Sequence, residues 1–249
     1  MSISMRLLPL IVCMTMALAA FFDLALAEGR KLVPERFEYT MFWGGINVGT
    51  SSLEVRASEH GSGYLIHTDA YSNDWLSKIY TVEDHALSFF ADLEDPLPDR
   101  YILETREGRS RKHRDIVFLP CDRSALYMDH IKGTQQELPV PERAYDPLSA
   151  FYKVRWMPLV VGTSLQVPLF ESKKFWTLEV KVLRKESVTV PAGIFNTVVI
   201  SPMMQSEGIF SRKGDMLIWL TDDERRRPVK LKSKVTVGTV DAELSGGAY

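Results

Sequence analysis

Hydrophobic and polar residues alternate with a period of two along most of this chain, and the alternation is clearest in residues 217–237. The apolar positions in the second half of that stretch are Val229, Leu231, Val235 and Val237. The interleaved positions are Lys230, Lys232, Lys234 and Thr236. A period of two is typical of strands with one face on a core and the other in water. We therefore expect two strands here, joined by a charged turn at Asp222–Pro228.

The same pattern recurs before and after this stretch and predicts about a dozen strands. The other expected strands are residues 35–43, 48–57, 64–71, 81–90, 100–106, 115–119, 124–131, 164–170, 175–184, 187–190, 195–202 and a tail at 240–244. Gly133–Pro141 is polar and contains prolines, which indicates a connector. Such short, closely spaced strands favour an antiparallel sheet, and a dozen twisted strands curl or close.

One segment has the period of an α-helix, Tyr145–Trp156. Asp146 is a suitable N-cap and Pro147 is tolerated at the first helical position. The apolar face of this helix is Leu148, Phe151, Tyr152 and Trp156. A second, short helix is expected within Ser72–Tyr80. Together these elements predict an all-β fold with one main helix, in which a curled antiparallel sheet forms an open or half barrel around an amphipathic helix.

The first residues have the pattern of a secretory signal peptide. Arg6 precedes the apolar run Leu7–Phe22, and Ala25-Leu26-Ala27 supplies a small-residue cleavage site. We expect cleavage after Ala27, with an uncleaved N-terminal anchor as the alternative. Residues 28–249 would then form one β-rich periplasmic domain with two strand-rich halves, about 28–141 and 142–249. No later stretch is apolar enough to predict a transmembrane segment.

Composition narrows the function classes. The chain has 249 residues, of which 45% are hydrophobic and 25% charged, and its net charge is -2. This balance argues against a nucleic-acid partner. After loss of Cys13 with the signal peptide, Cys121 is the only cysteine, so no internal disulfide is possible. Whether Cys121 is an inert or a reactive thiol does not follow from its neighbours in the sequence.

No familiar catalytic, metal or cofactor motif appears. The five histidines are His60, His67, His85, His113 and His130. None has another His or Cys at metal-ligand spacing, and there is no H-E-x-x-H, C-x-x-C or G-x-S-x-G sequence. We therefore expect surface histidines, no cofactor, no metal and no catalytic residues. If the protein were an enzyme, carboxylates such as Asp69, Glu83 or Asp84 would be its candidates.

Aromatic side chains are the leading candidates for ligand binding. They are spread along the expected strands and helix: Trp43, Trp75, Tyr80, Phe151, Tyr152, Trp156 and Trp219, with Trp176 in the same pattern. Inward aromatics at these positions fit either a filled core or an apolar cavity between sheet and helix. The sequence leaves both interpretations open.

A basic run at Arg106–Arg114 is the second candidate site. Its candidate residues for binding an anion or a partner are Arg109, Arg111, Lys112 and Arg114. Such a run can bind lipid headgroups, or it can be a solvated hairpin tip that prevents edge-to-edge pairing. At Asp222–Arg227, acids followed at once by bases indicate internal ion pairing rather than a calcium site.

Three motifs carry a resemblance to a known family: Tyr145–Ala150 (YDPLSA), Val190–Phe195 (VPAGIF) and Trp219–Arg226 (WLTDDERR), followed by Pro228-Val229. With them the chain resembles the exported bacterial proteins grouped as domain of unknown function 3108. The resemblance implies a Gram-negative periplasmic or envelope location. It implies no catalytic residues, because that family has no established activity. The expected architecture also looks like the half barrels of periplasmic lipoprotein and lipid carriers, by fold analogy alone.

The resulting expectation is a non-enzymatic periplasmic protein that binds an apolar or amphipathic envelope ligand, such as a lipid or a lipoprotein acyl chain. The alternative is an envelope scaffold that binds a protein partner through sheet edges or the basic run. An enzyme acting on envelope polymers is the third possibility. The sequence does not indicate an oligomeric state.

Overall fold

The computed structural model describes residues 34–59, 63–203, 216–235 and 238–249. The predicted signal peptide, residues 1–27, lies outside the described residues, as do His60, Thr236 and Val237. Val33–Tyr249 form one compact unit. The fold of this unit is all-β, with the described strands in a single antiparallel sheet that does not close.

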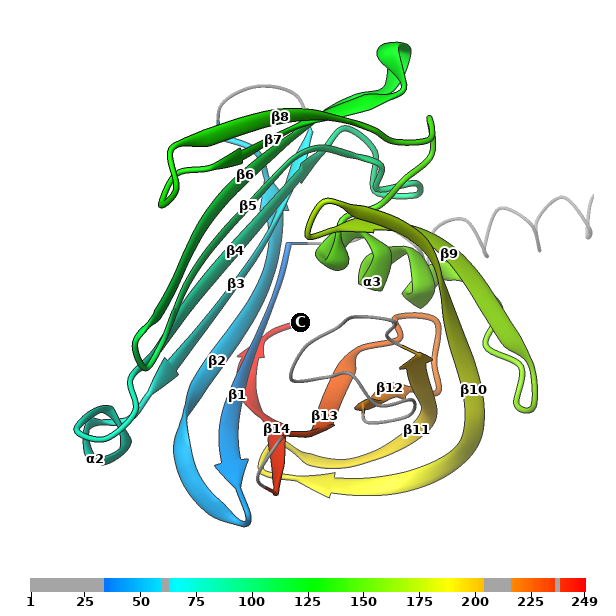
Figure 1. Ribbon diagram of the computed structural model, residues 1–249. Helices are drawn as coiled ribbons and strands as arrows, with labels where there is room; N and C mark the ends of the chain where they lie inside the picture. The colour runs from blue at the N-terminus through cyan, green and yellow to red at the C-terminus, as the bar shows by residue number, and fades with distance from the viewer. Residues whose placement is uncertain (1–33, 60–62, 204–215, 236–237) are drawn as a thin grey trace, which may run out of the picture. The chain divides into compact units, whose positions relative to one another are not determined.

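The sheet has fourteen described strands (Figure 1). The first eight are β1 (Glu35–Trp43), β2 (Ile46–Ala57), β3 (Tyr64–Ser72), β4 (Val82–Phe90), β5 (Pro98–Glu107), β6 (Ser110–Leu119), β7 (Ser124–Asp129) and β8 (Thr134–Pro139). The other six are β9 (Ser164–Glu171), β10 (Lys174–Val190), β11 (Gly193–Met203), β12 (Met216–Thr221), β13 (Pro228–Lys234) and β14 (Thr239–Ala248). Their spatial order is β8 to β1 and then β14 to β9, so β8 and β9 are the edges.

In the described part of the chain, three helical segments accompany the sheet: α2 (Asp74–Ser77), α3 (Pro147–Trp156) and a 3₁₀ turn at Pro120–Asp122. The predicted helix start is confirmed. The Asp146 side chain accepts from the backbone N–H groups of Leu148 and Ser149, and the Ser149 hydroxyl completes a capping box. The short helix is confirmed as α2, with Asn73 as its N-cap. The sheet curls so that α3 lies within its curve, next to β9 (Figure 1).

The structure corrects four details of the sequence prediction. Gly133–Pro141 is not only a connector, because it contains the edge strand β8. The two strands expected at 175–184 and 187–190 are one strand, β10, with a bulge between Val182 and Arg184. The C-terminal tail is a full strand, β14, that pairs with β1. Most of the basic run lies in β6 rather than in a turn, since only residues 108–109 separate β5 from β6.

The helix α3 packs on strands from both halves of the sheet. Ala150 and Val154 lie in a buried apolar cluster with β9, β10, β11 and β12; its strand members are Val167, Leu169, Leu178, Val180, Val182, Val198, Ile200, Ile218 and Leu220. Leu148 packs against a second cluster built on β4–β7 and Phe170. Burying apolar surface on both clusters positions the helix and defines an inner, helix-facing side of the sheet.

Candidate functional site

A buried ion pair links α3 to β1. The Arg155 side chain is fully buried and donates to both carboxylate oxygens of Glu35. The Tyr152 hydroxyl donates to the same carboxylate at 2.9 Å. Burial opposes the charge of Arg155, yet the neighbouring Tyr152 and Glu35 raise its pKa above the ordinary value. Burial also raises the pKa of Tyr152 well above its usual range, which keeps the phenol protonated as a donor.

The same arginine ties α3 to the turn between β12 and β13. Its Nε donates to the carbonyl oxygen of Arg226 and its Nη2 to that of Arg225, both at 3.0 Å. Within this turn, Arg226 pairs with Asp222 and Arg227 pairs with Asp223 at 3.2 and 3.0 Å. The prediction of internal ion pairing at this charged turn is therefore confirmed. The turn's carbonyl oxygens complete the hydrogen bonding of the buried guanidinium.

A second set of polar contacts holds the loop between β4 and β5 against the helix. Asp95 accepts from Lys153 at 2.8 Å, from the Tyr145 hydroxyl at 2.5 Å and from Arg143. Burial alone would raise the pKa of Asp95, but the hydrogen bonds from Lys153, Tyr145 and Arg143 outweigh it and lower that pKa. The carboxylate is therefore stabilised in its ionised form.

Asp95→Asn should lower the free energy of unfolding at neutral pH by about 1 kcal/mol. It should also make that free energy depend less on pH in the acid range. Because the folded-state pKa is lowered, the contribution of Asp95 is present above its unfolded pKa and is lost as pH falls through the lowered folded-state pKa. The difference in urea midpoint between the wild type and the variant should therefore narrow as the pH falls from 7 to 3. Asp92→Asn, in an exposed carboxylate of the same loop, is the control. If the difference in urea midpoint between the wild type and Asp95→Asn stayed constant from pH 7 to pH 3, the stabilisation of the ionised Asp95 would be contradicted.

The predicted aromatic residues do not form one site. Tyr152 is buried in the ion-pair network, while Phe151 and Trp156 are half-buried on α3. Trp219 points away from the helix, because Ile218 and Leu220 on either side of it face α3. Its indole Nε1 donates to Glu186 at 2.7 Å, and the Lys230 ammonium lies over its ring. Trp219 is therefore buried, but on the face of the sheet opposite α3, whereas Trp176 packs against the apolar cluster that α3 forms with β9–β12.

Trp43, Trp75 and Tyr80 instead lie at one end of the sheet, in a group that we call the apolar rim. Its members come from the end of β1, the start of β2, the end of β3 and the segment around α2: Trp43, Ile46, Tyr71, Trp75, Ile79 and Tyr80. Their exposed fractions run from 39% for Trp43 to 81% for Ile79. The Trp75 indole donates to the carbonyl oxygen of Asn47 at 3.2 Å, which joins α2 to the start of β2.

The basic run meets the apolar rim at the β5–β6 turn. Gly108 has φ +57°, and a Cβ there would come within 2.6 Å of the Tyr80 ring, so the turn packs directly on that ring. Arg109 and Arg111 are exposed at this turn. Arg114 is separate: it lies further along β6 and donates to the Ser172 hydroxyl at 3.0 Å in the β9–β10 turn. Of the four predicted basic residues, Arg109, Arg111 and Lys112 thus lie at the β5–β6 hairpin end, whereas Arg114 contacts the β9–β10 turn.

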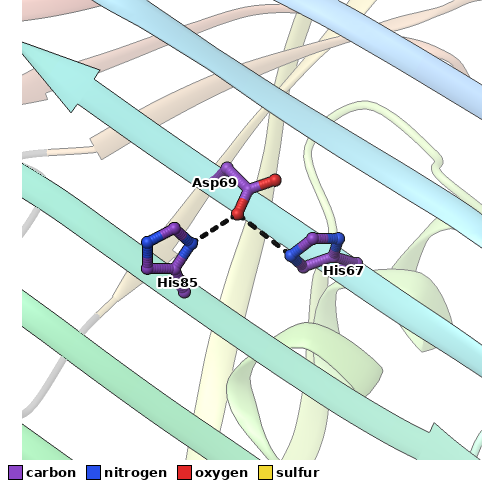
Figure 2. A group of neighbouring side chains, drawn as sticks. All are labelled: His67, Asp69 and His85. Atoms are coloured by element: carbon purple, nitrogen blue, oxygen red, sulfur yellow. Dashed lines mark hydrogen bonds and ion pairs between the residues drawn. The ribbon is translucent and has the colours of Figure 1, made fainter.

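On the face of the sheet that points away from α3, two histidines and an aspartate converge (Figure 2). Asp69 Oδ1 lies 2.9 Å from His67 Nε2 and 2.6 Å from His85 Nδ1. Asp69 and His85 are directly opposite each other in the β3–β4 register, and His67 is two residues from Asp69 on the same face. The spacing of the histidines in the sequence does not indicate this convergence of His67 and His85 on Asp69.

The signal for this cluster was present but incomplete in the sequence. His67-x-Asp69 on a strand places both side chains on one face. The third member depends on the β3–β4 register, because a shift of one residue would turn His85 to the inner face. That register is set by the segment around α2, where the Ser72 hydroxyl accepts from the Val82 N–H at 2.9 Å. Such a tertiary contact could not be read from the spacing of residues.

Among the residues that the structure describes, no helix has the length and apolar character needed to cross a bilayer.

Comparison with solved structures supports the architecture. The crystal structure of a "Beta-barrel-like Protein of Domain of Unknown Function DUF1849 from Brucella abortus" matches with a TM-score of 0.57 and 13% sequence identity. The match covers 87% of this chain and 97% of that protein. At this identity the likeness concerns the fold alone. The search of curated proteins finds no match.

The sequence comparison agrees with the three motifs. The family described as "Protein of unknown function (DUF3108)" matches residues 38–245, which include all three. In the structure each motif makes a tertiary contact: Asp146 accepts from the Ser88 hydroxyl of β4, the Ala192 N–H donates to the Leu244 carbonyl, and the 225–226 carbonyls accept from Arg155. The chain therefore belongs to the DUF3108 family of proteins of unknown function.

Proposed function

We propose that the protein is exported to the periplasm and binds an amphipathic envelope ligand, the surface of an anionic lipid bilayer, through the apolar rim and the basic residues beside it. The observation that carries this proposal is the clustering of exposed apolar side chains. Among the described residues, twelve large hydrophobic side chains are exposed, and half of them lie in the rim. Of the other six, Val160, Val161 and Leu183 lie near one another where the 160–163 turn bonds to Val182, and Ile131, Phe175 and Ile194 come from other turns and strands.

The composition of the rim suits a membrane surface. Tryptophan and tyrosine rings are favoured where apolar lipid meets water, because one end of the ring is apolar and the other can hydrogen-bond. Trp43, Tyr71, Trp75 and Tyr80 supply four such rings, and Ile46 and Ile79 add aliphatic surface. This mixture favours shallow insertion among lipid headgroups over contact with a purely apolar ligand.

Nearby positive charge provides the complementary attraction to an anionic surface. Lys78, Arg109 and Arg111 are exposed. Within the described part of the chain, no carboxylate forms an ion pair with any of the three. By contrast, Arg106 pairs with Glu83 and Lys112 with Glu107. A basic residue near an anionic membrane contributes about 1 kcal/mol of attraction.

The helix side of the sheet gives less support for a bound ligand. Tyr152 is 1% exposed and is fully engaged with Glu35 and Arg155. Ala150 and Val154 face packed strands. An acyl chain under α3 would have to displace these contacts, whereas the rim is open to a bilayer as it stands.

The test is vesicle binding by protein isolated from the periplasmic fraction, whose N-terminus should be Glu28. Sedimentation with vesicles of phosphatidylcholine and about one-third phosphatidylglycerol should capture the wild type, and pure phosphatidylcholine should capture much less. Arg109→Ala together with Arg111→Ala should weaken binding to the anionic vesicles by roughly 5- to 30-fold, equivalent to about 1–2 kcal/mol. Ile79→Ser should weaken it several-fold through lost apolar contact.

Ile194→Ser is the matched control, because Ile194 is similarly exposed, at 74%, but lies in the β10–β11 hairpin outside the rim. It should bind like the wild type. Equal capture by neutral and anionic vesicles would overturn the proposal, and so would equal losses for Ile79→Ser and Ile194→Ser.

A further inference from the structure

We propose that His67, Asp69 and His85 bind a divalent transition-metal ion, of the Co²⁺ to Zn²⁺ range, on the outer face of the sheet. This inference is independent of membrane binding, because it rests on a different group of residues. One atom from each side chain, namely His67 Nε2, Asp69 Oδ1 and His85 Nδ1, lies within 4.8 Å of the other two. In the part of the chain that the structure describes, this is the group that meets that condition.

The three atoms need only a small adjustment to surround an ion. Zinc binds histidine nitrogen at about 2.0–2.1 Å and carboxylate oxygen at about 2.0–2.2 Å, so tetrahedral ligand atoms are about 3.3 Å apart. Here both ring nitrogens approach a single carboxylate oxygen, at 2.9 and 2.6 Å (Figure 2). The nitrogens of His67 and His85 must move away from the carboxylate oxygen by about 0.4 and 0.7 Å to reach that spacing, a shift within the reach of side-chain rotation.

The donor set selects the class of ion. Two imidazole nitrogens and one carboxylate oxygen suit zinc, nickel, cobalt, copper or iron, whereas calcium and magnesium prefer all-oxygen sites. Three protein ligands also leave a coordination position for water or for a group from a ligand, as in zinc sites that are not purely structural. The site therefore fits a metal that stays accessible.

Neighbouring residues hold the ligands in place and leave them accessible. The Ser52 hydroxyl donates to the second oxygen of Asp69 at 3.3 Å, which leaves Oδ1 for the metal. The Tyr71 ring packs edge-on against the His85 ring at 5.3 Å. The side chains of His67, Asp69 and His85 are 30%, 17% and 32% exposed, so an ion can enter from solvent.

The same face supplies a matched control. Further along the sheet, His113 and His130 lie with their rings 4.3 Å apart, and His113 Nε2 is 3.3 Å from Glu104 Oε1. Glu104 is paired in register with both His85 and His113, so the two histidine groups occupy one row across β3–β6, with His130, just after β7, bonded to His113. The His113–Glu104 group does not bring three ligand atoms as close together as the His67–Asp69–His85 group.

The experiment is a titration of the EDTA-stripped full chain with Co²⁺, followed by its visible d–d absorption, and with Zn²⁺, followed by calorimetry. The wild type should bind one ion, and His67→Gln, His85→Gln and Asp69→Asn should each weaken binding by at least about 10- to 100-fold, since even an outer partner of a metal ligand contributes that much. His113→Gln should bind like the wild type. Zn²⁺ should also raise the melting temperature of the wild type and His113→Gln but not of His67→Gln.

Proton NMR of the wild-type imidazoles provides a measurement that does not depend on any variant folding. Zn²⁺ should shift the signals of two histidines and leave His113 and His130 in place. The proposal is overturned if the wild type gives no saturable Co²⁺ spectrum, if His113→Gln weakens binding as much as His67→Gln, or if the zinc-dependent NMR shifts fall on His113 and His130.

Discussion

Arg155→Met is expected to lower the free energy of unfolding by about 3–5 kcal/mol, the cost of breaking a buried ion pair by removing one partner. The substitution keeps much of the side-chain volume but leaves the Glu35 carboxylate buried without its counter-ion. It also removes the donors to the carbonyl oxygens of Arg225 and Arg226. Urea unfolding followed by circular dichroism measures the loss. The Tyr152 hydroxyl bond to Glu35 remains, but it cannot neutralise the charge.

Two further variants separate the buried charge from general effects of the substitution. Arg184→Met removes an arginine that also makes two hydrogen bonds to a glutamate, Glu186, but on an exposed face. It should cost less than about 1 kcal/mol. The double variant Glu35→Leu/Arg155→Met should lose less than Arg155→Met alone, since no unpaired charge is left inside. Equal losses for Arg155→Met and Arg184→Met would show that the buried pair does not anchor α3.

Leu244→Ala is expected to lower the free energy of unfolding by about 2–5 kcal/mol, the usual cost of truncating a fully buried leucine. Leu244 is 0% exposed and stands opposite Tyr39 where β14 pairs with β1. That pairing is the ladder through which the β1–β8 and β9–β14 halves join. The Leu244 carbonyl also accepts from the Ala192 N–H at 2.9 Å, so the β10–β11 turn is hydrogen-bonded to β14 at this residue.

The control for this variant is Ile194→Ala, in an apolar residue that is 74% exposed in the neighbouring hairpin. It should change stability by no more than about 0.5 kcal/mol. Because alanine preserves the backbone hydrogen bond at residue 244, any difference between the two variants reports side-chain packing at the β1–β14 junction. A Leu244→Ala midpoint equal to that of Ile194→Ala would mean that this junction contributes little to the stability of the sheet.

Much of the fold could be predicted from the sequence because its signals are local. Strand periodicity, the Asp146-Pro147 helix start and the turn at Asp222–Pro228 each depend on residues within about ten positions of one another. The errors arose where pairing partners decide the outcome. Thr134–Pro139 has little hydrophobic pattern, and it is a strand because β7 offers it a hydrogen-bonding edge.

The candidate sites were less accessible to sequence reasoning. The aromatic and basic candidates were identified as separate groups, but their meeting depends on the Tyr80 ring packing against Gly108. Trp219 was expected to share a face with Leu231, and the structure buries it on the other face of the sheet, against Glu186 and Lys230. A bulge in the β12–β13 pairing, between Trp219 and Leu220, accompanies this difference, because an extra residue shifts which side chains lie opposite one another.

By itself, the sequence determined the all-β class, the single main helix with its cap, and the motifs that mark the DUF3108 family. These features follow from hydrophobic periodicity and from the conformational preferences of Pro, Gly and capping residues, which act over short distances. Only the tertiary structure decided the order of the strands, the pairing of β14 with β1, the burial of Arg155 against Glu35 and the convergence of His67, Asp69 and His85. Each of those depends on strand register and on contacts between distant segments, and a period of two specifies a face of the sheet without specifying its neighbour.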